Sequence, residues 1–238
     1  MIVILFGIQG VGKSSVVNKA KASFPEGFWT HMQLGDNAFD LAIQDGIIKI
    51  EEYQPQPQDK IVMQEPEKGI FLVERNRVES IYIKSKDDIA LGRDYIRFIN
   101  VQTTKILQKD IFDFYANYIK SNPDKNFLIE THAALKTKQG YLPGLSLDFL
   151  KNIQPDAFII IEADAEKIFE RRINDTTRKR DHDTTLKDVQ KNLDITRYYA
   201  SSYATSVISP LIIVDNIEGQ LDDTAHDLGL PDRGVACL

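Results

Sequence analysis

The spacing of apolar residues along the chain predicts strands and helices in alternation. Five short, nearly continuous apolar runs are typical of strands that are buried on both faces. They cover residues 2–6, 28–34, 127–129, 157–161 and 211–214. The stretches between them carry apolar residues at helical spacing. The pattern therefore predicts an α/β fold in which helices flank a five-stranded parallel sheet.

Three of the expected helices can be bounded. Residues 94–119 form a long amphipathic pattern. Residues 164–173 begin at a candidate Asp N-cap, and residues 186–203 follow candidate Thr N-caps. We interpret most of the apolar residues in these helices as core.

Residues 47–92 interrupt the alternation, and we interpret them as an insertion. The segment Gln54-Pro55-Gln56-Pro57 is too rich in proline for a helix. Beyond it, the apolar runs 69–73 and 78–83 flank a polar turn, which predicts a β-hairpin. Fewer than about fifty residues rarely form a core of their own. The insertion is therefore expected to pack on the main body or on another subunit.

A glycine-rich segment follows the first expected strand. Residues 7–14, Gly-Ile-Gln-Gly-Val-Gly-Lys-Ser, match the phosphate-loop pattern G-x-x-x-x-G-K-[ST] between a strand and a helix. The glycines let backbone N–H groups converge on phosphate oxygens at the positive end of the helix. Lys13 is expected to place its charge between the β- and γ-phosphates, and the Ser14 hydroxyl to reach Mg²⁺. The chain is expected to bind a nucleoside triphosphate.

Composition narrows the class of partners. The 238 residues carry a net charge of −6 with a pI near 5.3, which argues against broad electrostatic attraction to nucleic acid or to an anionic membrane. The single cysteine, Cys237, cannot form an internal disulfide, which suits a reducing compartment. No run approaches the ~20 apolar residues of a membrane helix, and the N-terminus lacks the features of a signal peptide. We expect a cytoplasmic protein.

A run of arginines follows the fourth expected strand. Residues 171–181 read Arg-Arg-Ile-Asn-Asp-Thr-Thr-Arg-Lys-Arg-Asp and cover a helix end and the polar segment after it. Guanidinium groups there could close over a triphosphate and retreat again, as a lid does. The alternative is a solvated charged surface. The position after the fourth strand, with a phosphate loop after the first, favours the lid.

An acidic residue ends the third expected strand. Glu130 follows the apolar residues 127–129, at a place where phosphate-loop enzymes hold a Mg²⁺-bound water. The alternative is an acid that accepts hydrogen bonds from loop N–H groups. His132 lies close by, but the acceptor phosphate in nucleotide transfer is already anionic and needs no general base. His132 is therefore expected to shape the loop.

Four segments together resemble one family. They closely resemble the archaeal-type adenylate kinases, and the resemblance extends over residues 1–46 and 93–218. These segments are far more specific than the phosphate loop alone. They are 34–42 (Leu-Gly-Asp-Asn-Ala-Phe-Asp-Leu-Ala), Thr131-His132, 136–145 (Lys-Thr-Lys-Gln-Gly-Tyr-Leu-Pro-Gly-Leu) and 171–181.

The resemblance implies a fold and a reaction. The fold would be a three-layer P-loop kinase fold in a single domain, residues 1–238. The reaction would be the reversible transfer of the γ-phosphate of MgATP to AMP, which gives two ADP. It also implies a short lid without zinc, here residues 174–185, and assembly into a homo-oligomer, with a trimer favoured. The insertion 47–92 would lie beside the nucleoside monophosphate site. Residues 219–238 depart from the family pattern, and their weak helical pattern with Gly229, Pro231 and Gly234 predicts a loose tail.

The resemblance also implies roles for individual residues. Lys13, Arg172 and Arg178 would be catalytic, and Ser14 with Glu130, through water, would serve Mg²⁺. The ATP contacts would be Gly7, Ile8, Gln9, Gly10, Val11, Gly12, Lys13, Ser14 and Ser15, with Arg171 and Arg180 in the lid. The acceptor contacts would be Arg93 and Arg97, four apart on one helical face, with Lys136, Lys138, Tyr141 and Leu142.

Two departures from the family pattern leave alternatives open. The family usually has Asp where Glu130 stands. The longer side chain of Glu130 moves the carboxylate by about one methylene. The insertion interrupts the region that covers AMP, so a kinase of the same fold could act on another nucleoside monophosphate. A protein of another class, in which ATP gates the docking of a partner on the hairpin 71–83, is the second alternative. The two separate basic elements favour a kinase, because a switch needs no second phosphate contact.

Overall fold

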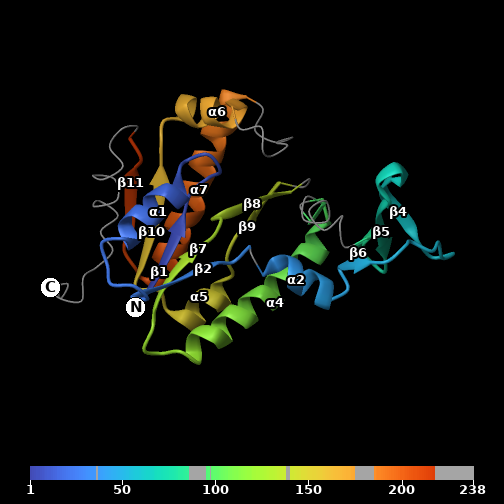
Figure 1. Ribbon diagram of the computed structural model, residues 1–238, viewed down its shortest axis with the longest axis horizontal. Coiled ribbons are helices and arrows are strands. Elements are labelled where there is room, and N and C mark those ends of the chain that lie inside the picture. The colour runs from blue at the N-terminus through green and yellow to red at the C-terminus, as the bar shows by residue number, and fades with distance from the viewer. Residues whose placement is uncertain (36, 86–94, 97, 138–139, 175–184, 218–238) are drawn as a thin grey trace. The chain divides into compact units, whose positions relative to one another are not determined.

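The computed structural model describes residues 1–35, 37–85, 95–96, 98–137, 140–174 and 185–217. The chain divides into two compact units. We name residues 1–32, 119–134 and 143–238 the phosphate-loop unit, and residues 33–118 and 135–142 the insert unit. Figure 1 shows the elements of both, which are described separately below.

A parallel sheet of five strands forms the centre of the phosphate-loop unit. The strands are β1 (Ile2–Phe6), β2 (Trp29–Gln33), β7 (Asn126–Glu130), β10 (Ala157–Glu162) and β11 (Leu211–Asp215). Their order is β11-β10-β1-β7-β2, and the central β1 pairs in parallel with β10 and β7. The five predicted apolar runs are confirmed as these strands. Because parallel strands end at one edge, Glu130 of β7 is placed beside the end of β1, where Leu5 is its partner in register.

Helices cover both faces of this sheet, as predicted. Leu5 belongs to a buried cluster that includes Val17 of the first helix. Successive side chains of a strand point to opposite faces, and Phe6 lies against Tyr203 with ring centres 5.9 Å apart. The result is three layers of secondary structure. The helices of the unit are α1 (Lys13–Lys21), α5 (Leu147–Ile153), α6 (Ala165–Asn174) and α7 (Leu186–Val207).

The caps predicted for α6 and α7 are confirmed. The Asp164 carboxylate accepts a hydrogen bond from the Glu166 amide at 2.8 Å. Thr185 and Asp188 form a capping box, in which the Thr185 hydroxyl accepts from the Asp188 amide at 3.1 Å and the Asp188 carboxylate accepts from the Thr185 amide at 3.2 Å. Across the described residues, every helix is too short or too polar to cross a membrane.

The insert unit contains a second sheet, of four strands, in the order β3-β6-β5-β4. The predicted hairpin is confirmed as β5 (Ile70–Arg75) and β6 (Val78–Ile83). Asn76 and Arg77 adopt φ values of 53° and 68°, which match the right-handed twist of a two-residue hairpin turn. The pattern had missed β3 (Ile48–Ile50), which has only three residues, and β4 (Lys60–Glu65), which is largely exposed.

Two further elements of the insert unit differ from the sequence expectation. No strand is predicted within residues 136–145, but β8 (Ala134–Thr137) and β9 (Gly140–Pro143) pair as a small hairpin. The unit also contains α2 (Ala38–Gln44) and the short 3₁₀ helix η1 (Pro66–Lys68).

The long helix α4 (Val101–Lys120) begins later than predicted. Residues 95 and 96 are helical but residues 98–100 are not, so the predicted continuous helix 94–119 is interrupted before α4. The cause is a cap, because the Asn100 side chain accepts from the Thr103 amide at 2.8 Å. The buried Glu79 carboxylate accepts from the Asn100 amide at 2.6 Å and fixes that cap to β6. Arg93 and Arg97 lie outside the described residues.

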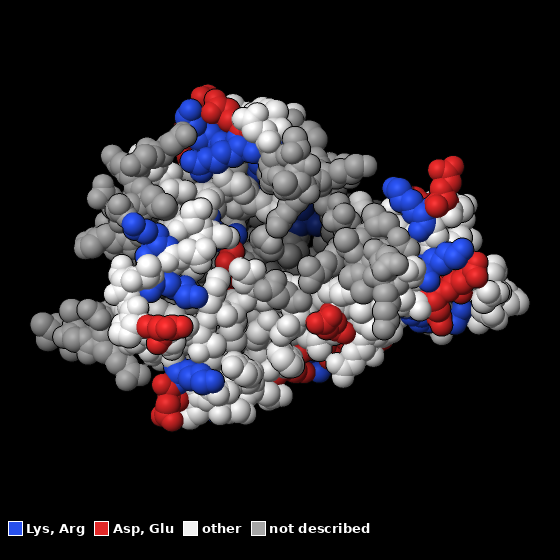
Figure 2. Space-filling view, viewed as in Figure 1, with Lys and Arg blue, Asp and Glu red and all other residues white. Residues whose placement is uncertain are grey.

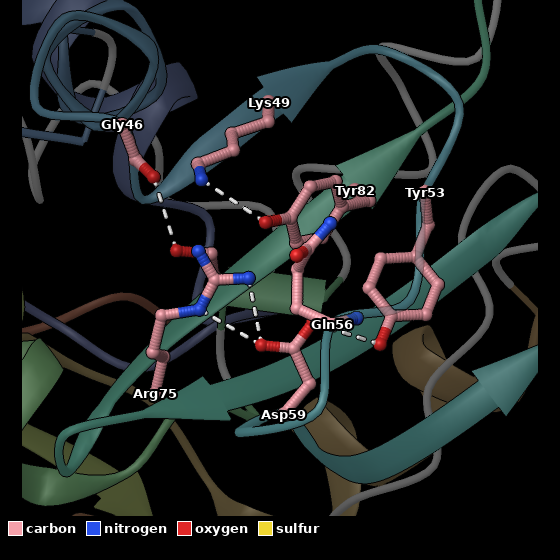
Figure 3. Close-up of polar contacts among 8 residues, drawn as sticks. Gly46, Lys49, Tyr53, Gln56, Asp59, Arg75 and Tyr82 are labelled. Carbon is pink, nitrogen blue, oxygen red and sulfur yellow. Dashed lines mark hydrogen bonds and ion pairs between the residues drawn. The ribbon is translucent and has the colours of Figure 1, made fainter.

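A closed polar network holds the proline-rich segment on the insert sheet (Figure 3). The Asp59 carboxylate accepts hydrogen bonds from the Tyr53 hydroxyl at 3.1 Å and from Arg75 Nε at 2.8 Å. The Tyr53 ring packs against Phe71 and Tyr82, with ring centres 4.9 and 5.0 Å away. Side chains of β5 and β6 thereby anchor a segment that has no regular structure of its own.

Candidate active site

The phosphate loop leaves β1 and turns directly into α1. Gly10 and Gly12 have φ values of 85° and 88°, a left-handed conformation that favours glycine. Gly12 is the N-cap of α1, so the loop ends at the positive end of the helix. Ser14 and Ser15 follow in the first turn with exposed side chains. This geometry is that of an anion-binding loop.

Lys13 lies across the base of the loop. Its Nζ donates to the Gly7 carbonyl at 2.7 Å and lies 3.6 Å from Glu130 Oε1. Desolvation lowers the pKa of Lys13, and the neighbouring Glu130 charge opposes that shift. The ammonium group is therefore held in place by a carbonyl and a carboxylate before any ligand binds.

Glu130 has a second partner that the sequence did not reveal. His31 Nε2 of β2 lies 3.3 Å from Glu130 Oε2. Burial raises the pKa of Glu130, but the hydrogen bond with His31 and the charge of Lys13 outweigh it, so the pKa is below its usual value. The carboxylate is ionised at neutral pH. The sequence could not predict this contact, because only the order of the strands in the sheet places β2 next to β7.

His132 follows two residues after Glu130 and is neutral at pH 7. Desolvation by the surrounding protein atoms and the positive charge of Lys13 lower its pKa to about 4. His132 is nevertheless an exposed residue. That His132 shapes the loop stays a prediction.

Side chains from distant elements hold the backbone carbonyls of the phosphate loop. The buried Arg172 donates from Nε to the Gln9 carbonyl at 2.8 Å, and Arg171 lies 3.5 Å from the Gly10 carbonyl. Asn216, just after β11, donates from Nδ2 to the Val11 carbonyl at 2.7 Å. Figure 2 shows basic side chains gathered over α6. Arg178 and Arg180, the other predicted lid residues, lie outside the described residues.

The predicted acceptor residues belong mainly to the insert unit. Lys136 is exposed on β8, and Tyr141 and Leu142 are partly exposed on β9. Lys138 lies outside the described residues, as Arg93 and Arg97 do. Within the phosphate-loop unit, the Tyr203 hydroxyl donates to the carbonyl of Ala133, which precedes β8 in the chain, at 2.7 Å.

The residues predicted to serve Mg²⁺ fit that ion. The exposed Ser14 hydroxyl and the ionised Glu130 carboxylate are hard oxygen donors, and Mg²⁺ commonly combines one or two such groups with waters and substrate phosphates. Within the described residues, no group of three or more His, Cys, Asp and Glu side chains could form a metal cage.

Comparison with known proteins identifies the family. A family model described as an AAA domain matches residues 82–189. The adenylate kinase of Methanococcus vannielii is 32% identical over 146 residues, which make up 61% of this chain and 74% of that protein. The chain belongs to the family of archaeal adenylate kinases.

Other adenylate kinases extend this result. The protein from Methanocaldococcus jannaschii is 25% identical over 229 residues, 95% of each chain. The protein from Methanothermobacter thermautotrophicus is 37% identical over 123 residues, so that match covers 51% of this chain and 66% of the length of that relative. The resemblance predicted from the sequence segments is confirmed at the level of the family, which is one of nucleoside monophosphate kinases.

Proposed function

We propose that the protein is an adenylate kinase that transfers the γ-phosphate of MgATP to AMP, reversibly, giving two ADP. The observation that carries the proposal is the phosphate loop, in which Lys13 is held between the Gly7 carbonyl and Glu130 in a chain of the adenylate kinase family. Membership of this family implies that the loop binds ATP. The name of the relatives supports AMP as the acceptor.

The donor phosphates are proposed to bind over residues 7–15. Backbone N–H groups of the loop and the N-terminal end of α1 favour negative charge there. Lys13 would exchange its contact with Glu130 for phosphate oxygens and stabilise the charge of the transferring group. Arg172 and Arg178 are proposed as the guanidinium groups that share this charge, with Arg171 and Arg180 as further lid contacts.

Ser14 and Glu130 are proposed to hold Mg²⁺, Ser14 directly and Glu130 through water. When bound, the ion would neutralise charge on the nucleotide phosphates. Glu130 would remain ionised for this role because Lys13 and His31 keep its pKa low.

The acceptor is proposed to bind to Arg93 and Arg97 through its phosphate, and to the β8–β9 hairpin through Lys136, Lys138, Tyr141 and Leu142. Its reactive oxygen is already anionic, so the neutral His132 is given no proton-transfer role. One observation favours a second candidate, a kinase for another nucleoside monophosphate. The insertion forms an ordered sheet within the unit that carries these acceptor residues.

A phosphoryl-transfer assay with MgATP and AMP, CMP, UMP, GMP or no acceptor tests the proposal. We expect ADP formation that depends on AMP and is lost in Lys13→Ala but not in Lys151→Ala, a change at a surface lysine of α5. Preference for another acceptor would replace AMP in the proposal. Slow hydrolysis without an acceptor would favour the ATP-gated binding protein instead. Molar-mass measurement in solution tests the homotrimer that the resemblance favours.

A further inference from the structure

A residue far from the phosphate loop in sequence controls one of its peptide groups. Asn216 follows β11, and its Nδ2 donates to the Val11 carbonyl at 2.7 Å. The contact joins the end of an edge strand of the sheet to the last turn of the loop before α1. The proposed reaction assigns no role to this side chain.

Holding the Val11 carbonyl fixes the direction of the next N–H group. In a trans peptide the C=O of one residue and the N–H of the next lie in one plane and point in opposite directions. The hydrogen bond that Asn216 donates to Val11 therefore turns the Gly12 N–H away from Asn216. Gly12 is the N-cap of α1, where N–H groups meet an anion.

The approach of Asn216 depends on glycine at position 12. A Cβ atom at Gly12 would lie 2.4 Å from Asn216 Nδ2, closer than such atoms approach. The same residue has a φ of 88°, which also favours glycine. The loop is thus shaped to admit this amide at short range.

Asn216 is itself held from behind. Its backbone amide donates to the Glu162 carbonyl at 2.7 Å. The Glu162 carboxylate is buried and accepts from Arg197 Nε at 2.6 Å and from Arg197 Nη2. The side-chain amide of Asn216 therefore extends from a backbone that is hydrogen-bonded to β10.

We propose that Asn216 is a positioning residue that orients the Gly12 N–H toward the bound triphosphate, whatever base the nucleotide carries. The proposal rests on the binding of a triphosphate by the loop. Arg171 and Arg172 hold the two neighbouring carbonyls from α6, beside the proposed lid. Asn216 acts from β11, so its hold on the loop does not depend on the position of the lid.

Titration calorimetry on the full chain tests this role with two ligands, MgATP and inorganic tripolyphosphate. Asn216→Ala is expected to weaken both by about tenfold, which corresponds to ~1.4 kcal/mol. Asn216→Asp is expected to weaken both further, because a carboxylate would face the Val11 carbonyl oxygen, repel it and no longer hold the peptide group in its orientation. The matched control is Ile217→Ala, the next residue, whose side chain is 54% exposed and whose loss should change neither affinity.

Each outcome of this experiment decides a separate point. Weakening confined to ATP, with tripolyphosphate unchanged, would overturn the proposal and assign Asn216 to the base. A lower melting temperature with both affinities unchanged would also overturn it and leave Asn216 a purely structural role. If the wild-type protein bound neither ligand, the proposed kinase function would fail together with this inference. Equal weakening of both ligands in the folded variant supports it.

Discussion

The two units use similar polar side chains in different ways. In the phosphate-loop unit, Lys13 and Asn216 each donate to a backbone carbonyl of the loop at 2.7 Å. In the insert unit, Tyr53 and Arg75 donate to the side chain of Asp59. The first arrangement holds carbonyls of a loop that is proposed to bind phosphate through its N–H groups, whereas the second closes on itself. Side chains that donate to loop carbonyls therefore indicate a candidate binding site in the phosphate-loop unit. The closed ring of side chains around Asp59 indicates a structural anchor in the insert unit.

The largest effect is expected from Lys13→Ala, which removes the ammonium group that contacts the Gly7 carbonyl and leaves the insert network unchanged. We expect the turnover number to fall by about a thousandfold or more, because Lys13 is proposed to neutralise charge on the transferring phosphoryl group. Steady-state kinetics with MgATP and AMP measures this. Unchanged far-UV circular dichroism and melting temperature would confirm that the loss is chemical. Turnover near that of wild type would remove Lys13 from the mechanism.

A large effect on stability is expected from Gly144→Ala, at the base of the β8–β9 hairpin. A Cβ atom there would lie 1.8 Å from the His132 carbonyl oxygen, so the backbone must move. We expect a loss of about 3 kcal/mol in the free energy of unfolding. Chemical denaturation measures it. The control is Gly35→Ala, since a Cβ at Gly35 meets no atom within 4 Å. Equal stability of the two variants would contradict the geometry.

A smaller effect on activity is expected at Glu130. Glu130→Gln keeps the side-chain length but removes the charge that faces Lys13 and would hold a Mg²⁺-bound water. Residues that orient metal-bound groups commonly contribute about 10- to 100-fold, and we expect a loss in that range together with a higher Mg²⁺ requirement. Turnover measured against Mg²⁺ concentration tests this.

Glu130→Asp is the companion variant, because it restores the residue type usual in the family. It keeps the charge but draws the carboxylate back from His31. We expect a loss smaller than that of Glu130→Gln. If both variants behaved like wild type, Glu130 would be an acid of the strand end with no part in metal binding.

Much of the phosphate-loop unit could be predicted from sequence because its elements are local. Buried parallel strands read as continuous apolar runs, and the caps at Asp164 and Thr185 depend on residues within one turn. The glycine-rich loop carries its own signature. What could not be predicted depends on sheet order. His31 and Asn216 join the site only because β2 and β11 fold to opposite edges of one sheet.

The insert unit was harder to predict for a different reason. Its hairpin has a turn signal, but β3 is only three residues long and pairs in parallel with β6, far along the chain. The break before α4 was not predicted because the apolar period continues through Ile96 and Ile99, whereas α4 itself begins only after the Asn100 cap. Local periodicity does not reveal the Asn100 cap, because the Glu79 carboxylate that accepts from the Asn100 backbone amide lies on a separate strand, β6.

The smallest effect on catalysis is expected from Asp59→Asn, which opens the closed network and leaves the phosphate loop untouched. The change removes the charge that Arg75 faces at 2.7 Å and weakens the acceptor for Tyr53 and Gln56. We expect faster proteolysis within residues 51–58 and no change in affinity for MgATP. Mass spectrometry of limited digests locates the cuts. The control is Asp148→Asn, an exposed residue of α5, which should leave the digest unchanged.

The stability of the same Asp59 network is expected to depend on pH. Burial raises the pKa of Asp59, but the hydrogen bonds from Arg75 and Gln56 outweigh it, so the folded pKa lies below its usual value. A carboxyl group whose pKa is lowered by folding stabilises the folded state above its unfolded pKa of about 4. This stabilisation is lost as the pH falls through the folded pKa. Proteolysis of residues 51–58 by an acid-active protease should therefore accelerate below about pH 4 in wild type. Asp59→Asn should cleave fast at every pH. A wild-type digest that did not change with pH would mean that the proline-rich segment is held by Tyr53 packing on Phe71 and Tyr82 rather than by charge.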